Sequence, residues 1–310
     1  MQINSRKQPM SNTPYSQSLS GIVFLILAQM MVGINIVASK LLIPNISAFV
    51  LLEMRFGLAA ILLLILHYLH RGKKASKVNP LRTLTSRDWF FILAQALSAG
   101  FLFNVLMLMG LHYTGANEAA IITSTLPAII AVLSWVLLRE RVGGKQSFSI
   151  ILATLGLLVI AYDKLTPSQG YHSFFGDFLI VVSLLPEAAY YVLCKLHPNK
   201  LPVFLISALM NGINAIVILP IALSLAPHVP DLGIDAWLII FLLGLSSGLF
   251  YVFWFFGYQQ VDSTMASLST TVMPVATVLF AWAILGERLT LTQSFGMLLV
   301  LFSIVAYARK

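Results

Sequence analysis

The chain has 310 residues, of which 59% are hydrophobic and only 10% are charged, and its mean hydropathy is +0.90. An ordinary soluble domain is about 25% charged and about 45–50% apolar. One water-soluble core cannot bury this much apolar surface, which argues against a soluble enzyme, a disordered chain and a nucleic-acid-binding protein. The single cysteine, Cys194, excludes an internal disulfide framework and a cysteine-based metal site.

Ten stretches of the sequence have the apolar character of membrane helices, which need ~20 such residues to cross ~30 Å of hydrocarbon. They are expected at residues 19–39, 46–68, 89–112, 116–138, 146–162, 175–195, 202–225, 236–257, 263–285 and 293–308. The connections between them are short, so no separate soluble domain is expected. Residues 1–18 are polar and are predicted to form a disordered cytoplasmic tail. The sequence therefore predicts an all-α integral membrane protein with ten transmembrane helices.

Basic residues are distributed unevenly over the predicted loops. With ten helices, 15 of the 19 Lys and Arg residues fall on the side of the two termini and three on the other, while Arg55 lies inside the second span. Positive residues concentrate in cytoplasmic loops. We therefore expect a multi-pass protein of the plasma (bacterial inner) membrane with both termini cytoplasmic. This orientation accounts for the formal net charge of +8 without a nucleic-acid partner.

An internal repeat is visible as residue pairs at a fixed offset. The pairs 147 residues apart include Thr123 and Thr270, Pro127 and Pro274, Trp135 and Trp282, and Glu140 and Glu287. The first and sixth spans also match, with Lys40 and Lys195 offset by 155. The chain therefore divides into five-helix units, 19–165 and 175–308. Because five is odd, the second unit enters the membrane from the opposite side, which is the inverted repeat of many secondary transporters.

Several short motifs along residues 19–308 together resemble the pattern of a known family. The motifs are Gly33-Ile34-Asn35 with Lys40, Pro44 with Arg55, Tyr113-Thr114-Gly115-Ala116 with Pro127 and Arg139-Glu140-Arg141, Gly176-Asp177, and Ala266 with Pro274 and Gly286-Glu287-Arg288. In this order they resemble the drug/metabolite transporter superfamily, specifically the ten-helix type with two inverted EamA repeats. The sequence departs from the family pattern at Val32, where Trp is common, and in its unusual Pro186-Glu187. The resemblance implies transport of small organic metabolites, often amino acids and usually outward, with no catalytic residues and no nucleotide site.

Two prolines lie near the middle of predicted spans. Proline lacks an N–H, so it cannot bond the carbonyl group four residues earlier in a helix. Pro127 and Pro274 therefore leave the carbonyl groups of Thr123 and Thr270 without a helical partner. Such groups are costly in lipid unless they face protein or a wet cavity. Both threonines are therefore candidates for substrate binding and both prolines for hinges. The alternative is that each hydroxyl satisfies its own backbone and the proline only bends the helix.

Glu187 lies deep in the sixth predicted span, where an ionisable side chain suggests a functional role. It is a candidate for proton coupling or for binding the amino group of a substrate, and a protonated carboxyl that bonds a neighbouring helix is the alternative. Tyr190, Tyr191 and Cys194 follow it on the same helix face. We include both tyrosines in the predicted substrate site.

Other polar and aromatic side chains complete the predicted cavity. Asn35 and Asn104 are buried amides, and Tyr251 and Trp254 can face one way from a dense aromatic run. A cavity of this kind suits an amphipathic metabolite. Arg55 is expected to act as a structural charge that holds neighbouring carbonyls, with a direct carboxylate site as the alternative.

Glu140 and Glu287 follow predicted helix ends and are expected to anchor turns, as structural charges without substrate contact. No metal site and no cofactor are expected. The function that these observations favour is a secondary transporter, most consistent with export of amino acids or related zwitterions by alternating access. The alternatives are a broad-specificity drug efflux carrier and, from other classes, a membrane-embedded enzyme or a channel. The expected partners are the small-molecule substrate and the lipid bilayer, and the protein is expected to be a monomer or homodimer.

Overall fold

The computed structural model describes residues 18–70, 80–138, 174–199, 201–225, 232–261 and 263–308, with isolated positions between 144 and 159. These residues form helices and short connections, and no strand occurs among them. In chain order the elements are α1 (Leu19–Leu42), α2 (Ala48–His70), η1 (Pro80–Thr83), α3 (Ser86–Gln95), η2 (Ala96–Leu102), α4 (Phe103–Tyr113), α5 (Ala116–Thr123), α6 (Leu126–Leu138), α8 (Phe174–Leu196), α9 (Val203–Leu225), α10 (Ile234–Tyr258), α11 (Ser263–Ser269), α12 (Val272–Phe280), η4 (Ala281–Leu285) and α13 (Leu291–Ala308).

Eight segments within the described residues are long and apolar enough to cross a membrane. They agree with eight of the ten predicted spans; three of them are built from two or three consecutive helical elements. The fifth predicted span, 146–162, lies largely outside the described residues. A helix, α13, does lie at the tenth predicted position. The residues that the structure describes are therefore helical, with eight candidate membrane spans, and the number ten stays a prediction.

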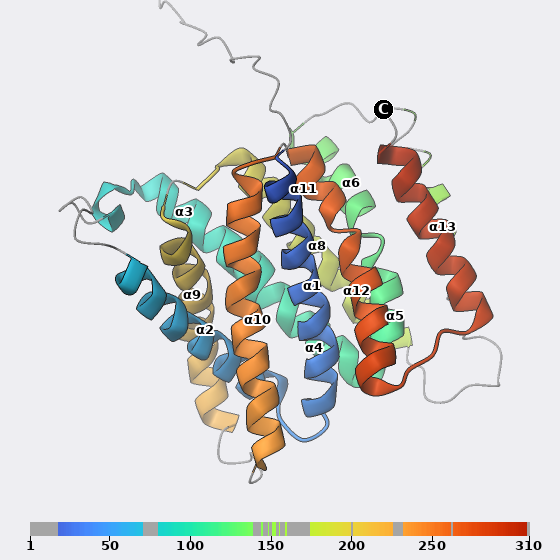
Figure 1. The fold of residues 1–310 in the computed structure, drawn as a ribbon, viewed down its shortest axis with the longest axis horizontal. Helices are drawn as coiled ribbons and strands as arrows, with labels where there is room; N and C mark the ends of the chain where they lie inside the picture. Colours follow the sequence, from blue (N-terminus) through green and yellow to red (C-terminus); the bar gives the residue numbers. More distant parts are fainter. Residues whose placement is uncertain are drawn as a thin grey trace, which may run out of the picture.

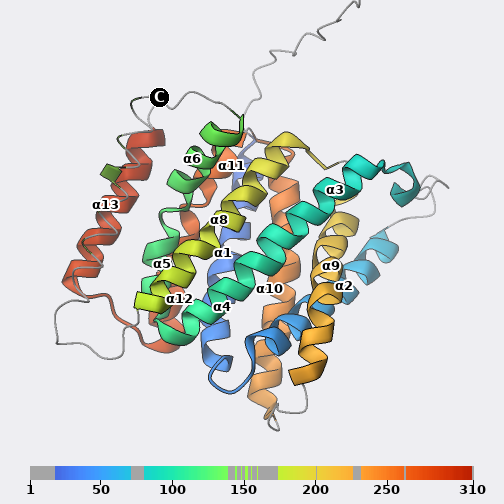
Figure 2. The same ribbon diagram turned by 180° about the vertical axis from the view of Figure 1, so that it is seen from behind.

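The helices pack as a bundle in which α1 lies between α10 and α12 in Figure 1 and behind α4 and α8 in Figure 2. α1 contacts α10 and α12, α2 lies along α9, and α4 lies along α8. Small residues allow the closest approaches. A Cβ atom on Gly257 of α10 would lie 2.9 Å from the carbonyl oxygen of Gly21 in α1, and one on Gly110 of α4 would lie 2.9 Å from that of Gly176 in α8. Glycine at such crossings lets helix backbones approach closely, as is typical of membrane bundles.

Two helical segments are interrupted at positions that correspond in the predicted repeat. α5 and α6 are separated at residues 124–125, and α11 and α12 at residues 270–271. Pro127 and Pro274 then lie in the first turn of α6 and α12, where a missing N–H removes no intrahelical bond. The two interrupted segments run in opposite directions through the bundle (Figure 1).

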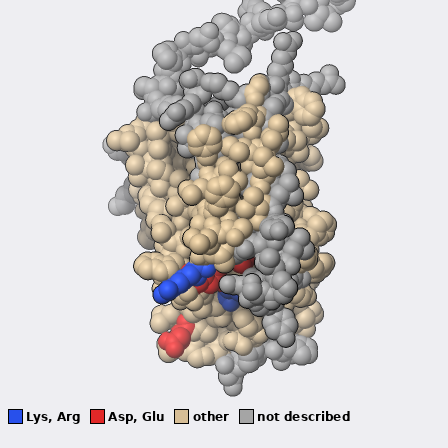
Figure 3. Space-filling model, turned by 90° about the vertical axis from the view of Figure 1, so that its right-hand side faces the viewer, with Lys and Arg blue, Asp and Glu red and all other residues tan. Residues whose placement is uncertain are grey.

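The outer surface of the bundle is apolar. On α2, for example, Ile61, Ile65 and Leu69 are exposed. The described residues on the face shown in Figure 3 are mostly uncharged, and their few Lys, Arg, Asp and Glu side chains gather near one end. Contiguous exposed apolar surface on this scale indicates contact with lipid.

Candidate solute-binding site

A pocket lies inside the bundle between helices from both predicted halves of the chain. The space between its lining side chains, including the part that is open to the surroundings, is about 370 Å³. Its lining residues are Val32 and Asn35 of α1, Arg55 and Phe56 of α2, Ala99, Phe103 and Asn104 of η2 and α4, Glu187 of α8, and Ser247, Phe250 and Tyr251 of α10. The walls are therefore largely apolar and aromatic, with one basic and one acidic side chain, which is the usual composition of a small-molecule site.

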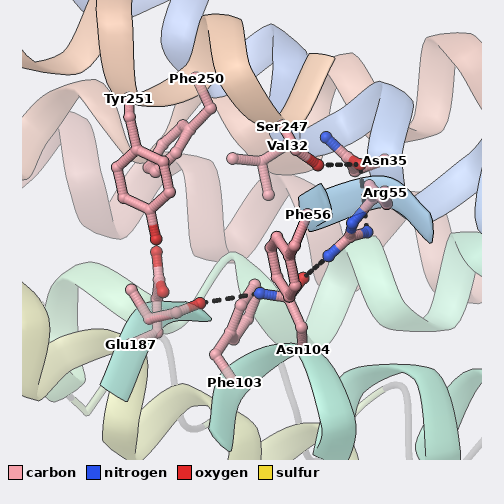
Figure 4. A pocket seen from close by; sticks show the side chains of 11 residues that line it. Val32, Asn35, Arg55, Phe56, Phe103, Asn104, Glu187, Ser247, Phe250 and Tyr251 are labelled. Carbon is pink, nitrogen blue, oxygen red and sulfur yellow. Dashed lines mark hydrogen bonds between the residues drawn. The ribbon is translucent and has the colours of Figure 1, made fainter. Parts of the chain in front are cut away.

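The Arg55 guanidinium is held by two asparagines of the pocket wall, each of which bonds one of its Nη atoms. Its Nη1 donates a hydrogen bond to Asn35 Oδ1 at 3.1 Å, and its Nη2 donates one to Asn104 Oδ1 (Figure 4). Ser247 also donates to Asn35 Oδ1 at 3.1 Å. The side chain of Arg55 is only 2% exposed, and its Cζ lies 4.8 Å from the centre of the Phe56 ring.

The π-helical segment η2 positions Asn104. A π-helix breaks the regular i→i+4 hydrogen-bond pattern and is frequent at functional sites. The Asn104 amide nitrogen donates to the backbone oxygens of Ala99 and Gly100, at 2.8 and 2.7 Å. Because the amide nitrogen of Asn104 bonds the backbone, its side-chain oxygen is the atom that faces Arg55. The local backbone of η2 thus determines which atom of Asn104 meets the guanidinium.

Glu187 occupies the opposite wall, directly after Pro186 in α8, and is 2% exposed. The Tyr251 hydroxyl points toward it from α10 (Figure 4). Tyr251 lines the same pocket as Glu187 and Arg55. The two charged residues form no ion pair with each other among the described contacts. The pocket therefore separates a basic side chain from an acidic one.

Tyr190, Tyr191 and Trp254 form a buried aromatic cluster beside the pocket rather than lining it. The Tyr191 and Trp254 rings meet edge to face with centroids 4.9 Å apart. Gln29 donates to the Tyr191 hydroxyl at 3.1 Å. The Tyr190 hydroxyl and the Trp254 indole nitrogen are buried without an ordinary hydrogen-bond partner. The cluster lies on the side of Glu187 toward the C-terminal end of α8.

The predicted substrate contacts of Thr123 and Thr270 have no counterpart in this pocket. Both side chains are fully buried, and their hydroxyls donate to the carbonyl oxygens of Ala120 and Ser267, at 2.9 and 2.7 Å. This is the local backbone bonding that the sequence left open as the alternative. Their role in binding, and that of Pro127 and Pro274 as hinges, stays a prediction.

Of the predicted site residues, the structure brings together Asn35, Asn104, Glu187 and Tyr251. It adds Arg55, which was expected to be structural, and Ser247. The signal for Arg55 was present in the sequence, since a permanently charged side chain within a span marks a functional position by default. Ser247 gave no such signal, because a lone serine in a membrane helix usually bonds its own backbone.

Glu287 lies away from the pocket, where its carboxylate accepts hydrogen bonds from the backbone nitrogens of Ala116 and Asn117. Lys40 lies nearby and donates to the backbone oxygens of Leu111 and Thr114, at 2.5 and 2.6 Å. Glu140 lies outside the described residues. Among the residues that the structure describes, no group of three or more His, Cys, Asp or Glu side chains is arranged to hold a metal ion.

A pocket within a bundle of candidate membrane-spanning helices is the arrangement expected of a membrane transporter. The chain belongs to the EamA-like transporter family, whose sequence pattern matches residues 19–162 and 174–309. It is similar to the uncharacterized transporter YetK of Bacillus subtilis (strain 168), with 29% identity over 92% of this chain and 86% of that protein. It is also similar to an uncharacterized transporter of Archaeoglobus fulgidus, with 28% identity over 90% and 95%. A solved crystal structure shares the fold, with a TM-score of 0.65 at 16% identity over 94% of this chain and 98% of that one.

Proposed function

We propose that this membrane transporter exports small organic metabolites, amino acids or related zwitterions, through the central pocket. The observation that carries the proposal is the separation of Arg55 and Glu187 on opposite walls of one largely apolar pocket. A zwitterion presents a carboxylate and an ammonium group that these side chains complement. The aromatic walls suit the remaining, less polar part of such a solute.

The proposed mechanism is alternating access between two inverted five-helix repeats. The pocket receives side chains from α1, α2 and α4 of the first unit and from α8 and α10 of the second. Motion of one unit against the other would open this site to each side of the membrane in turn. The interruptions before Pro127 and Pro274 are the proposed hinges. Both termini are proposed to lie in the cytoplasm of a bacterial cell.

Glu187 is the proposed proton-coupling group. A carboxyl buried in the membrane is more easily kept neutral than charged, so it exchanges a proton when its surroundings change. Binding of a solute ammonium group favours the ionised form, and solute release favours the protonated form. The solute and the proton would thus use the same carboxyl in opposite phases of the cycle.

Solute counterflow in proteoliposomes tests the carrier proposal. Purified protein is reconstituted with a panel of unlabelled amino acids inside the vesicles, and uptake of a trace of the same labelled amino acid is followed. A carrier takes up the label faster when unlabelled solute is inside, because both use the same site. Uptake that is unaffected by internal solute, or that does not saturate, would identify a channel and exclude alternating access.

A further inference from the structure

We propose that Arg55 binds the carboxylate of the transported solute, and that an anionic carboxyl group is therefore required of every substrate. This inference rests on the proposed carrier function and assigns the atom that recognises the solute. It changes the role of Arg55 from a structural charge to the selectivity determinant of the pocket.

The first support comes from the hydrogen-bond donors of Arg55. A guanidinium has five N–H donors in a rigid planar arrangement. Nη1 and Nη2 each bond one asparagine oxygen, whereas the buried Nε has no hydrogen-bond partner. An unsatisfied buried donor costs about 1–3 kcal/mol, and more when it is charged. A carboxylate is the group that accepts two parallel hydrogen bonds from an arginine edge.

The second support comes from charge. Among the described residues, no carboxylate lies within ion-pair distance of Arg55, and both of its hydrogen-bond acceptors are neutral amides. Glu53, two residues away on α2, does not form a pair with it. Removing an ion from water costs several kcal/mol even after the protein relaxes. A buried guanidinium without a counterion therefore favours the entry of an anion.

The third support is that the surroundings hold Arg55 in place before a solute arrives. Asn35 donates to the Met31 backbone oxygen at 2.9 Å, so its side-chain oxygen faces Arg55 and Ser247. Asn104 is fixed in the same way by the carbonyls of η2. A recognition group held by two fixed acceptors loses little conformational entropy on binding, which favours affinity and selectivity.

The opposite wall sets the orientation of the solute. With its carboxylate on Arg55, an amino acid would direct its ammonium group toward Glu187 and Tyr251 across the pocket (Figure 4). Phe56, Phe103 and Phe250 then surround its side chain. The pocket should accept free amino acids and reject derivatives whose carboxyl group is blocked or absent.

A thermal-shift assay on the purified protein tests this inference. The probes are the free amino acids, and for each one that raises the melting temperature, its carboxamide and its decarboxylated amine. For the parent we expect the amide and the amine to require at least about tenfold higher concentration than the acid, corresponding to about 1.4 kcal/mol. In Arg55→Gln the acid should lose this advantage over its amide. A merely structural role would weaken all three probes equally.

Two further variants keep the test decisive. Asn104→Asp leaves Arg55 in place but supplies a carboxylate inside the protein, which should compete with the acid and lower its advantage even if Arg55→Gln fails to fold. Arg87→Gln removes an arginine that lies over Phe91 outside the pocket and should behave as the parent.

The outcomes separate the inference from the carrier function. The role of Arg55 would be overturned if the parent responded equally to acid and amide, or if Arg55→Gln and Asn104→Asp kept the preference for the acid. Counterflow could still establish a carrier in that case. If the preference for the acid depends on Arg55 but the solute shows no counterflow, the carboxylate site is supported and transport of that solute is excluded. If no free amino acid shifts the melting temperature of the parent, the assignment of Arg55 as the carboxylate site for an amino acid is wrong.

Discussion

Glu287 accepts a hydrogen bond at 2.9 Å from the backbone nitrogen of Asn117, far away in the sequence. Its other oxygen lies 3.3 Å from the nitrogen of Ala116. These nitrogens begin α5, whose N-cap residue, Gly115, offers no side chain. A helix start leaves its first N–H groups without intrahelical partners. The carboxylate therefore caps a helix of one predicted repeat from a turn of the other.

Removing this cap should destabilise the start of α5. We expect Glu287→Ala to lower the free energy of unfolding by about 1 kcal/mol, the usual loss for an N-cap. Glu287→Gln should cost less, because it keeps an acceptor but loses the favourable charge at the helix N-terminus. Thermal unfolding and amide hydrogen exchange at residues 117–122 measure both effects. Arg288→Gln, in the same turn, is the control, and an equal loss there would show that any charge change in this turn has the effect.

A second prediction concerns the crossing of η2 and α9. A Cβ atom on Gly100 would lie 1.8 Å from Asn214 Nδ2, and Asn214 is fully buried and donates to the Met210 backbone oxygen at 2.7 Å. Gly100→Ala must therefore displace Asn214 or η2. We expect a loss of about 1–3 kcal/mol, as for other overpacked sites.

The matched control is on α9 itself. A Cβ atom on Gly212 would meet only the Ala60 side chain, at 3.8 Å. Gly212→Ala should be neutral or slightly stabilising, because alanine favours the helix. Because Gly100 also accepts a hydrogen bond from Asn104, Gly100→Ala should weaken solute binding in addition to stability. Equal melting temperatures for the two variants would show that the crossing is not tight.

The helical framework could be predicted from the sequence because membrane spans depend on length and hydropathy alone. Eight predicted spans agree with the structure, including those interrupted before Pro127 and Pro274. The break itself falls a few residues earlier than each proline. A proline is best tolerated in the first turn of a helix, so it marks where the next helix begins.

The candidate site could be predicted only in part, because the sequence indicates some of its residues but not the contacts between them. Asn35, Asn104 and Glu187 could be predicted because polar side chains are rare within spans. Tyr251 could be predicted because it shares a helix face with Trp254 in an aromatic run. The contact between Arg55 and Asn104 depends on the π-helical segment η2, and no periodicity in the sequence indicates that segment. The cap by Glu287 depends on which turn approaches α5, and this follows from tertiary packing rather than from local sequence.

Neutralising Glu187 should uncouple transport from the proton gradient. In proteoliposomes the parent should move solute faster under an imposed pH gradient, since each pH unit supplies about 1.4 kcal/mol per proton. Glu187→Gln cannot exchange a proton, so its solute flux should not respond to the gradient, although counterflow can continue. Glu53→Gln, a carboxyl outside the pocket lining, is the control and should respond as the parent does. Unchanged pH dependence in Glu187→Gln would exclude the coupling role.

The aromatic cluster should control access to Cys194. This buried free thiol lies beside Tyr190 and Trp254, both fully buried. A maleimide should therefore react slowly with the folded parent, in which Cys194 is the only cysteine of the chain. Trp254→Ala would leave a cavity beside the thiol, and we expect the reaction to accelerate at least about tenfold, with a stability loss of about 3–5 kcal/mol typical of such a truncation.

Mass spectrometry of the Cys194 adduct over time measures this rate, and Trp254→Phe provides a milder variant should the alanine variant unfold. Trp237→Ala is the matched control, because this tryptophan of the same helix α10 is 50% exposed and faces outward. Its variant should react as slowly as the parent. If the Trp254 and Trp237 variants react at the same rate, the thiol is reached by general loosening of the bundle. A selective effect at Trp254 would instead mean that this ring shields the buried thiol.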